Sequence, residues 1–171
     1  DYKGATLLYR DVARRVAKLH ILFEEAGIKP GDRIALCGKN SSNWGTACLA
    51  ALTYGAVVVP ILHEFKSDNI HHIINHSETK LFFAGDQIWE NLNEASMPNV
   101  EGIITLDEFQ LVISRNEKLT YAREHLNELF GRKYPKEFTK AAVKYFEAGF
   151  DDLAMINYTS GPTGISKAVR L

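Results

Sequence analysis

Residues 33–60 read RIALCGKNSSNWGTACLAALTYGAVVVP, and this stretch decides the fold class. Residues 33–38 and 56–60 are short apolar runs punctuated by glycine or proline, which is typical of buried strands. Between them, the polar residues 40–42 are suited to cap the N-terminus of a helix over 43–54. A strand, a helix and a second strand in this order predict a βαβ unit with two parallel strands.

The same alternation continues on both sides of this unit. Upstream, apolar residues recur at every third or fourth position across residues 9–26, which predicts an amphipathic helix ended by Gly27. Downstream, the pattern predicts a helix over 67–76 capped by Ser67, a strand over 80–84, a helix over 86–93, a strand over 102–106 and a buried strand over 151–158. We therefore expect an α/β fold with a mostly parallel sheet covered by helices.

Residues 107–148 are more charged than the rest and have a helical period, with a break expected at Tyr134-Pro135. We expect a helical insertion here, within one partial domain over residues 1–171. The 46% hydrophobic and 24% charged composition fits an ordinary globular domain.

Charge and cysteine content narrow the function classes. Twenty basic and twenty-one acidic residues give a net charge of -1. This charge gives no electrostatic reason to expect binding to nucleic acid or to an anionic membrane surface. Cys37 and Cys48 are too few for a disulfide framework, so we expect buried free thiols in a reducing compartment. No signal peptide or membrane-spanning run is evident, and we expect a cytoplasmic protein.

Residues 158–167, YTSGPTGISK, gather hydroxyls, glycines and a lysine directly after an apolar strand. Glycines let backbone N–H groups approach phosphate oxygens, while hydroxyls and a flexible lysine supply further donors. A nucleotide-phosphate loop is the natural interpretation. It is not a P-loop, because Ser166 stands where that pattern requires glycine.

The run TSGPTGISKAV over 159–169 resembles the signature of the adenylate-forming, or AMP-binding, superfamily, whose usual form is Thr-Ser-Gly-Thr-Thr-Gly, two residues, then Lys-Gly-Val. Other stretches resemble the same family: TLLYRDVARRVAKL (6–19), AGIKPGDRIAL (26–36), SSNWGTACLAALTYGAVVVPI (41–61) and SDNIHHIINHSETKLFFAGD (67–86). Within the family, the chain looks most like the N-terminal portion of a long-chain fatty acid–CoA ligase.

The resemblance implies a two-step reaction. A carboxylate attacks the α-phosphate of MgATP and releases pyrophosphate, and coenzyme A then displaces AMP from the acyl-adenylate. It also implies that the β- and γ-phosphates are held by Thr159, Ser160, Gly161, Thr163, Gly164 and Lys167. The catalytic residues are expected beyond residue 171, so this polypeptide alone is expected to be inactive. Because long-chain substrates partition into membranes, the whole enzyme is expected to visit a membrane surface.

Two positions depart from the family pattern. Pro162 replaces threonine or serine, which removes a hydroxyl and a backbone N–H from the loop, and Ala168 replaces glycine. Neither is counted as a site residue.

Histidines give weaker signals. His63 follows a predicted strand at the edge where open α/β sheets bind ligands, and we make it a candidate acyl- or nucleotide-proximal residue. His72 and His76 lie one helical turn apart, but no third ligand accompanies them, so we predict no metal site.

Two alternatives stay open. A short-chain or aryl-CoA ligase, or a peptide-synthetase adenylation domain, would share the loop and differ in its acid pocket. A non-catalytic nucleotide-binding domain would have lost activity through Pro162.

Overall fold

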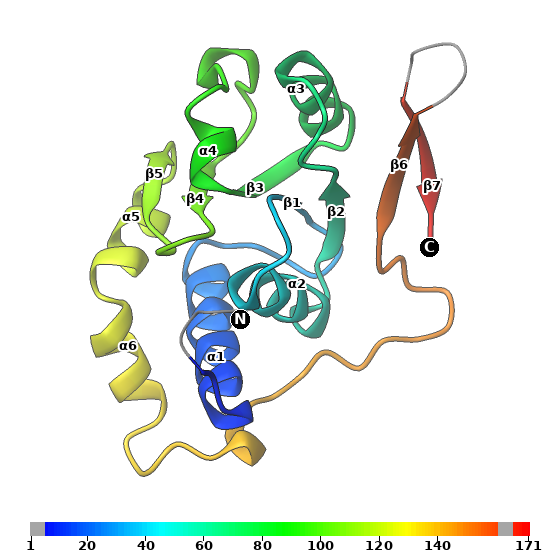
Figure 1. Ribbon diagram of the computed structural model, residues 1–171. Coiled ribbons are helices and arrows are strands. Elements are labelled where there is room, and N and C mark those ends of the chain that lie inside the picture. Colours follow the sequence, from blue (N-terminus) through cyan, green and yellow to red (C-terminus); the bar gives the residue numbers. More distant parts are fainter. Residues whose placement is uncertain (1–5, 161–165) are drawn as a thin grey trace.

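The computed structural model describes residues 6–160 and 166–171 (Figure 1). A five-stranded sheet has the order β2-β1-β3-β4-β5, and β6 and β7 form a separate two-stranded hairpin. The strands are β1 (Arg33–Cys37), β2 (Val57–Ile61), β3 (Thr79–Ala84), β4 (Gly102–Thr105), β5 (Leu111–Ser114), β6 (Ile156–Ser160) and β7 (Ser166–Arg170). The helices are α1 (Tyr9–Glu25), α2 (Ser42–Tyr54), α3 (Ser67–His76), α4 (Asp86–Trp89), α5 (Glu117–Glu124) and α6 (Leu126–Lys133), with 3-10 turns at Glu94–Ser96 and Lys140–Ala142.

The central sheet is parallel except at one edge. β1 pairs in parallel with β2 and β3, β3 pairs in parallel with β4, and β5 pairs antiparallel with β4. This confirms the predicted α/β class with a mostly parallel, helix-covered sheet.

Neighbouring residues of each strand point to opposite faces of the sheet. Residues on both faces are buried, in two separate core clusters. In one core cluster, Ile34 and Phe83 pack against α1 and α2. The other takes Ala35 and Phe82 and packs them against α3. The continuous apolar runs predicted as strands therefore reflect burial on two faces.

Glycines end the two helices that cover the first face. Gly27 has φ 78°, its N–H donates to the Glu24 carbonyl, and the Ile28 N–H donates to the Phe23 carbonyl, which completes a Schellman motif after α1. Ser41 is the N-cap of α2 and its side chain accepts from the Trp44 N–H, and Gly55, with φ 85°, is the C-cap. Both predicted helix ends are confirmed.

Three predictions need correction. Ser67 does not cap α3: the N-cap is Lys66, and the Ser67 hydroxyl donates to the Asn91 carbonyl. The helix that begins at Asp86 ends at Trp89 instead of residue 93. The last buried strand over 151–158 is wrong in extent and burial, since β6 begins at Ile156 and only Tyr158 of that range is buried; β6 pairs with β7 outside the main sheet.

The segment over 107–148 carries more than helices. β5 joins the main sheet, and α5 and α6 then pack beside α1. Its description as an insertion stays a prediction.

Cys37 is buried and Cys48 half-buried, and both are free thiols. Burial raises the pKa of the Cys37 thiol to about 12, so this thiol stays protonated at neutral pH. No helix in the described ranges is long and apolar enough to cross a membrane.

Gly55→Ala tests the turn between α2 and β2. Alanine would have to adopt the positive φ of this position, and its Cβ would lie 2.6 Å from the Phe146 ring. We therefore expect the free energy of unfolding to fall by about 1 to 3 kcal/mol. The measurement is the urea unfolding midpoint.

Gly131→Ala is the matched control, because a Cβ there meets nothing within 4 Å and the residue lies inside α6. Alanine favours a helix interior by roughly 0.5 to 1 kcal/mol over glycine, so stability should stay level or rise. Equal losses in both variants would remove the argument for the left-handed turn.

Candidate functional site

The hairpin of β6 and β7 places two predicted phosphate-binding residues side by side. Thr159 lies directly opposite Lys167 in the antiparallel register, and both side chains are exposed. Residues directly opposite one another in such a pair point to the same face of the hairpin. A hydroxyl and an ammonium group therefore project together near the point where the two strands meet the loop.

The rest of the predicted phosphate set is less fully described. Ser160 pairs with Ser166 in the last rung of the hairpin. The predicted site residues Gly161, Thr163 and Gly164 lie outside the described residues, as does Pro162.

Tyr158 fixes the orientation of this hairpin. It is 4% exposed and packs in the second core cluster. Its hydroxyl lies 2.7 Å from His76 Nδ1 on α3, and the two rings meet edge to face. Burial raises the pKa of the Tyr158 phenol, which stays neutral at pH 7. Because neighbouring strand residues point to opposite faces, an inward Tyr158 turns Thr159 outward.

The hairpin runs beside the edge strand of the main sheet. Val58 of β2 and Met155 form a parallel bridge, and the Val58 N–H donates to the Ala154 carbonyl at 3.0 Å. Because the two strands run in the same direction, the loop end of the hairpin and the carboxyl end of β2 point the same way. Figure 1 shows both at the top of the molecule.

A crevice of about 570 Å³ opens at this carboxyl edge. Its lining includes the residues that follow four parallel strands: Gly38, His63, Gly85 and Leu106. The chain passes from β1 outward to β2 and returns to β3 on the other side of β1, so the crevice lies at the switch in strand order. Ligands of open α/β sheets bind at such switch points.

Gly38 and Gly85 lie at the base of this crevice, where the ends of β1 and β3 approach each other closely. A Cβ on Gly38 would lie 3.5 Å from the Gly85 backbone nitrogen and 2.6 Å from Leu106 Cδ1. The Gly85 N–H donates to the Cys37 carbonyl, which ties the two strand ends together. A larger residue at position 38 would first meet the Leu106 side chain, whereas its contact with the Gly85 backbone would be an ordinary one.

His63 stands between the crevice and the hairpin. It lines both the crevice and a second cavity of about 110 Å³, and Asn157 of β6 lines the second cavity as well. Its Nδ1 atom is 3.3 Å from Glu64 Oε2. The proximity of His63 to a bound acyl group or nucleotide stays a prediction.

An acidic pair in the crevice was not predicted from sequence. The Asp86 N–H donates to Asp107 Oδ2 at 3.4 Å, and both residues line the crevice. Burial, and then the neighbouring Asp107 charge, raise the pKa of the Asp86 carboxyl. Each aspartate follows the end of a parallel strand within two residues, and this common position was the available sequence signal.

No group of three or more metal-ligating side chains occurs among residues 6–160 and 166–171. The His72 and His76 rings lie 5.7 Å apart, but His76 already contacts the Tyr158 hydroxyl.

Comparison with known proteins gives consistent results. A family model described as AMP-binding enzyme matches residues 1–171. YdaB of Bacillus subtilis (strain 168), whose acyl-CoA ligase assignment is provisional, is 31% identical over 165 residues, covering 95% of this chain and 29% of that protein. Long chain acyl-CoA synthetase 3 of Arabidopsis thaliana is 28% identical, covering 95% of this chain and 24% of that protein.

Solved structures share the fold. ATP-bound MatB from Rhodopseudomonas palustris superposes with a TM-score of 0.69 at 21% identity, covering 98% of this chain and 30% of that one. The chain thus spans less than a third of the length of the relatives named here. Because the family model matches it from end to end, the chain belongs to the AMP-binding enzyme family.

Proposed function

We propose that this chain is the ATP-phosphate-binding part of a ligase that joins a long-chain fatty acid to coenzyme A through an acyl-adenylate. The observation that carries the proposal is the outward pair of Thr159 and Lys167 on a hairpin that points to the carboxyl edge of the sheet. Phosphate recognition needs donors at this kind of edge, where ligands of α/β folds bind.

In this reaction these residues form no covalent bond and act by stabilising charge. The acid's carboxylate attacks the α-phosphorus of ATP, the bond to the bridging oxygen breaks, and pyrophosphate leaves with the electron pair. Negative charge grows on the leaving group in the transition state, where preorganised donors act most strongly. Lys167 supplies a positive charge and Thr159 a hydroxyl, and magnesium bound with ATP would neutralise further charge.

The crevice offers the remaining reactants a place beside the hairpin. Its volume of about 570 Å³ falls within the roughly 300 to 1,000 Å³ of ligand sites. His63 and Asn157 connect the crevice to the hairpin. We propose that His63 lies close to the acyl group or the nucleotide of a bound substrate.

The choice of a long-chain fatty acid rests on resemblance. The Arabidopsis relative is a long chain acyl-CoA synthetase, and residues 67–86 resemble that class of ligase. A reaction that consumes ATP and coenzyme A fits the cytoplasm, with visits to a membrane surface for the acid.

Carboxylate-dependent exchange of labelled pyrophosphate into ATP tests the proposal on the full-length protein. We expect exchange with palmitate and none with acetate, benzoate or amino acids. Exchange with benzoate or an amino acid alone would keep the adenylation step and replace the acid. No exchange in the wild type or in Pro162→Thr, which restores the family's hydroxyl, would overturn the enzyme assignment.

Lys167→Gln tests the phosphate contact. Losing a charge-assisted hydrogen bond costs roughly 1.5 to 3 kcal/mol, so we expect the KM for ATP to rise about tenfold to a hundredfold. Arg170→Gln is the matched control, because Arg170 lies on the same strand at the other end of the hairpin, opposite Ile156. Equal KM changes in both variants would point to general electrostatics instead of a contact at Lys167.

Tyr158→Phe tests the anchor of the hairpin. It removes the hydroxyl that contacts His76 and keeps the buried ring, so we expect about 0.5 to 1.5 kcal/mol lower stability together with a raised KM for ATP. Tyr9→Phe serves as the control, since Tyr9 is 94% exposed. A stable variant with unchanged KM would show that the hydrogen bond does not position the loop.

A further inference from the structure

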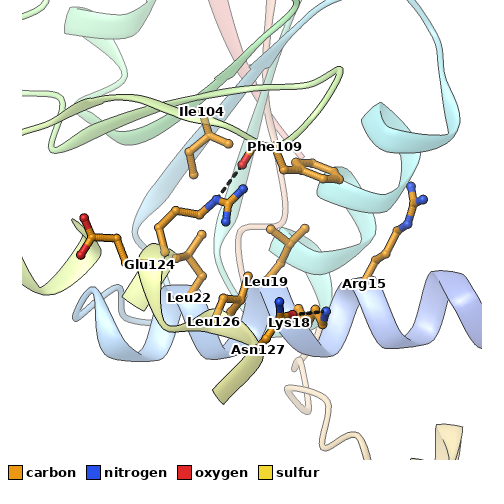
Figure 2. Close-up of a pocket in the computed structure, with 10 residues that line it drawn as sticks. Arg15, Lys18, Leu19, Leu22, Ile104, Phe109, Glu124, Leu126 and Asn127 are labelled. Atoms are coloured by element: carbon orange, nitrogen blue, oxygen red, sulfur yellow. Dashed lines mark hydrogen bonds between the residues drawn. The ribbon is translucent and has the colours of Figure 1, made fainter. Parts of the chain in front are cut away.

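A further pocket lies on the opposite side of the main sheet from Tyr158. It has a volume of about 300 Å³ and lies between α1, the turn before β5, and helices α5 and α6 (Figure 2). Its wall includes Leu19 and Leu22 of the first core cluster, whereas Tyr158 packs in the second cluster. The pocket is therefore separate from the candidate phosphate site.

The floor of this pocket is apolar. Leu19, Leu22 and Ile104 form its base but are only 4%, 1% and 0% exposed, so the apolar surface open to a ligand is mainly that of the half-buried Phe109 and Leu126. In Figure 2 these side chains come from α1, from β4, from the turn before β5 and from α6, the helix opposite α1. Such a lining favours a hydrocarbon chain over water.

The rim of the pocket is cationic. Arg15, Lys18 and Arg123 line it, and all three are half-buried. Each hydrogen-bonds a neutral oxygen: Arg15 donates to Asn43 Oδ1, Lys18 to Asn127 Oδ1 at 2.7 Å, and Arg123 to the Phe109 carbonyl at 2.8 Å. None of the three forms an ion pair with a carboxylate in the described part of the chain.

The single acidic residue of the lining does not offset this charge. Glu124 is exposed, and Figure 2 shows its carboxylate at the opposite end of the pocket from Arg15 and Lys18. Burial, followed by the charges of Arg14 and Arg123, lowers the pKa of the Lys18 ammonium. Lys18 and Arg123 thus repel each other beside an apolar surface, and an anion placed between them would relieve that repulsion.

We propose that this pocket binds a single-chain amphiphile, its tail on Phe109 and Leu126 above the buried leucines of α1 and its carboxylate or phosphate head among Arg15, Lys18 and Arg123. The site does not depend on the proposed ligase activity. Its small volume suits a short or medium chain, since it lies at the low end of ligand cavities.

Calorimetric titration of the full-length protein with four probes tests the chemistry of the ligand. We expect saturable binding of decanoate, decyl phosphate or both, and the tighter of the two identifies the head group. Decanol keeps the tail without the charge, and inorganic phosphate keeps the charge without the tail, so both should bind at least tenfold more weakly. Either one binding as tightly as the amphiphiles would overturn the proposal.

Variants then locate the site, because a ligase would also bind decanoate in its acid pocket. Lys18→Gln should weaken decyl phosphate binding up to about fivefold, the upper end of the range for a partly exposed charge contact. Glu124→Gln should strengthen it by removing a like charge. Arg132→Gln is the control, since Arg132 lies on α6 outside the pocket and pairs with Glu128.

Arg123 also holds the Phe109 carbonyl, so Lys18→Gln is preferred to Arg123→Gln as the primary variant. Unchanged unfolding midpoints establish that the variants fold. Equal affinity in the wild type, Lys18→Gln and Glu124→Gln would overturn the proposal, as would an equal loss in Arg132→Gln.

Discussion

Burial of β1 and β3 on both faces is the constraint on which the rest of the structure depends. Residues 34–37 and 81–84 are all 0% exposed. Strands in that position cannot face water on either side, and parallel strands need crossovers that return the chain to the starting edge. The crossovers include α2 and α3, which cover opposite faces, and they bring the carboxyl ends of β1 to β4 to the same edge. The crevice, His63 and the acidic pair lie there for that reason.

The central βαβ unit could be predicted because its signals are local. Continuous apolar runs, a capping serine before α2 and glycines after α1 and α2 each act within a few residues. β5 escaped prediction because a half-exposed strand of four residues, LVIS, carries little periodicity in a charged segment. The pairing of β6 with β7 was not predicted, since an apolar run indicates burial but does not identify the strand with which it pairs.

In the candidate site, too, the local features could be predicted and the long-range contacts could not. Thr159 and Lys167 were predicted because they belong to one contiguous run, although the strand pairing that sets them opposite one another appears only in the structure. The Tyr158 contact with His76 joins residues 82 positions apart, and Asp86 meets Asp107 across 21 positions. Such contacts depend on the completed sheet, and no local spacing encodes them.

The separate pairing of the hairpin has a kinetic consequence. Its rungs connect residues close in sequence, whereas its attachment to the main sheet consists of one parallel bridge at Val58 together with side-chain packing of Met155, Ile156 and Tyr158. Local hairpins form in about 1 to 10 μs, and weakly attached segments open without global unfolding. Amide hydrogens of the hairpin therefore belong to a different exchange class from those of β1 and β3.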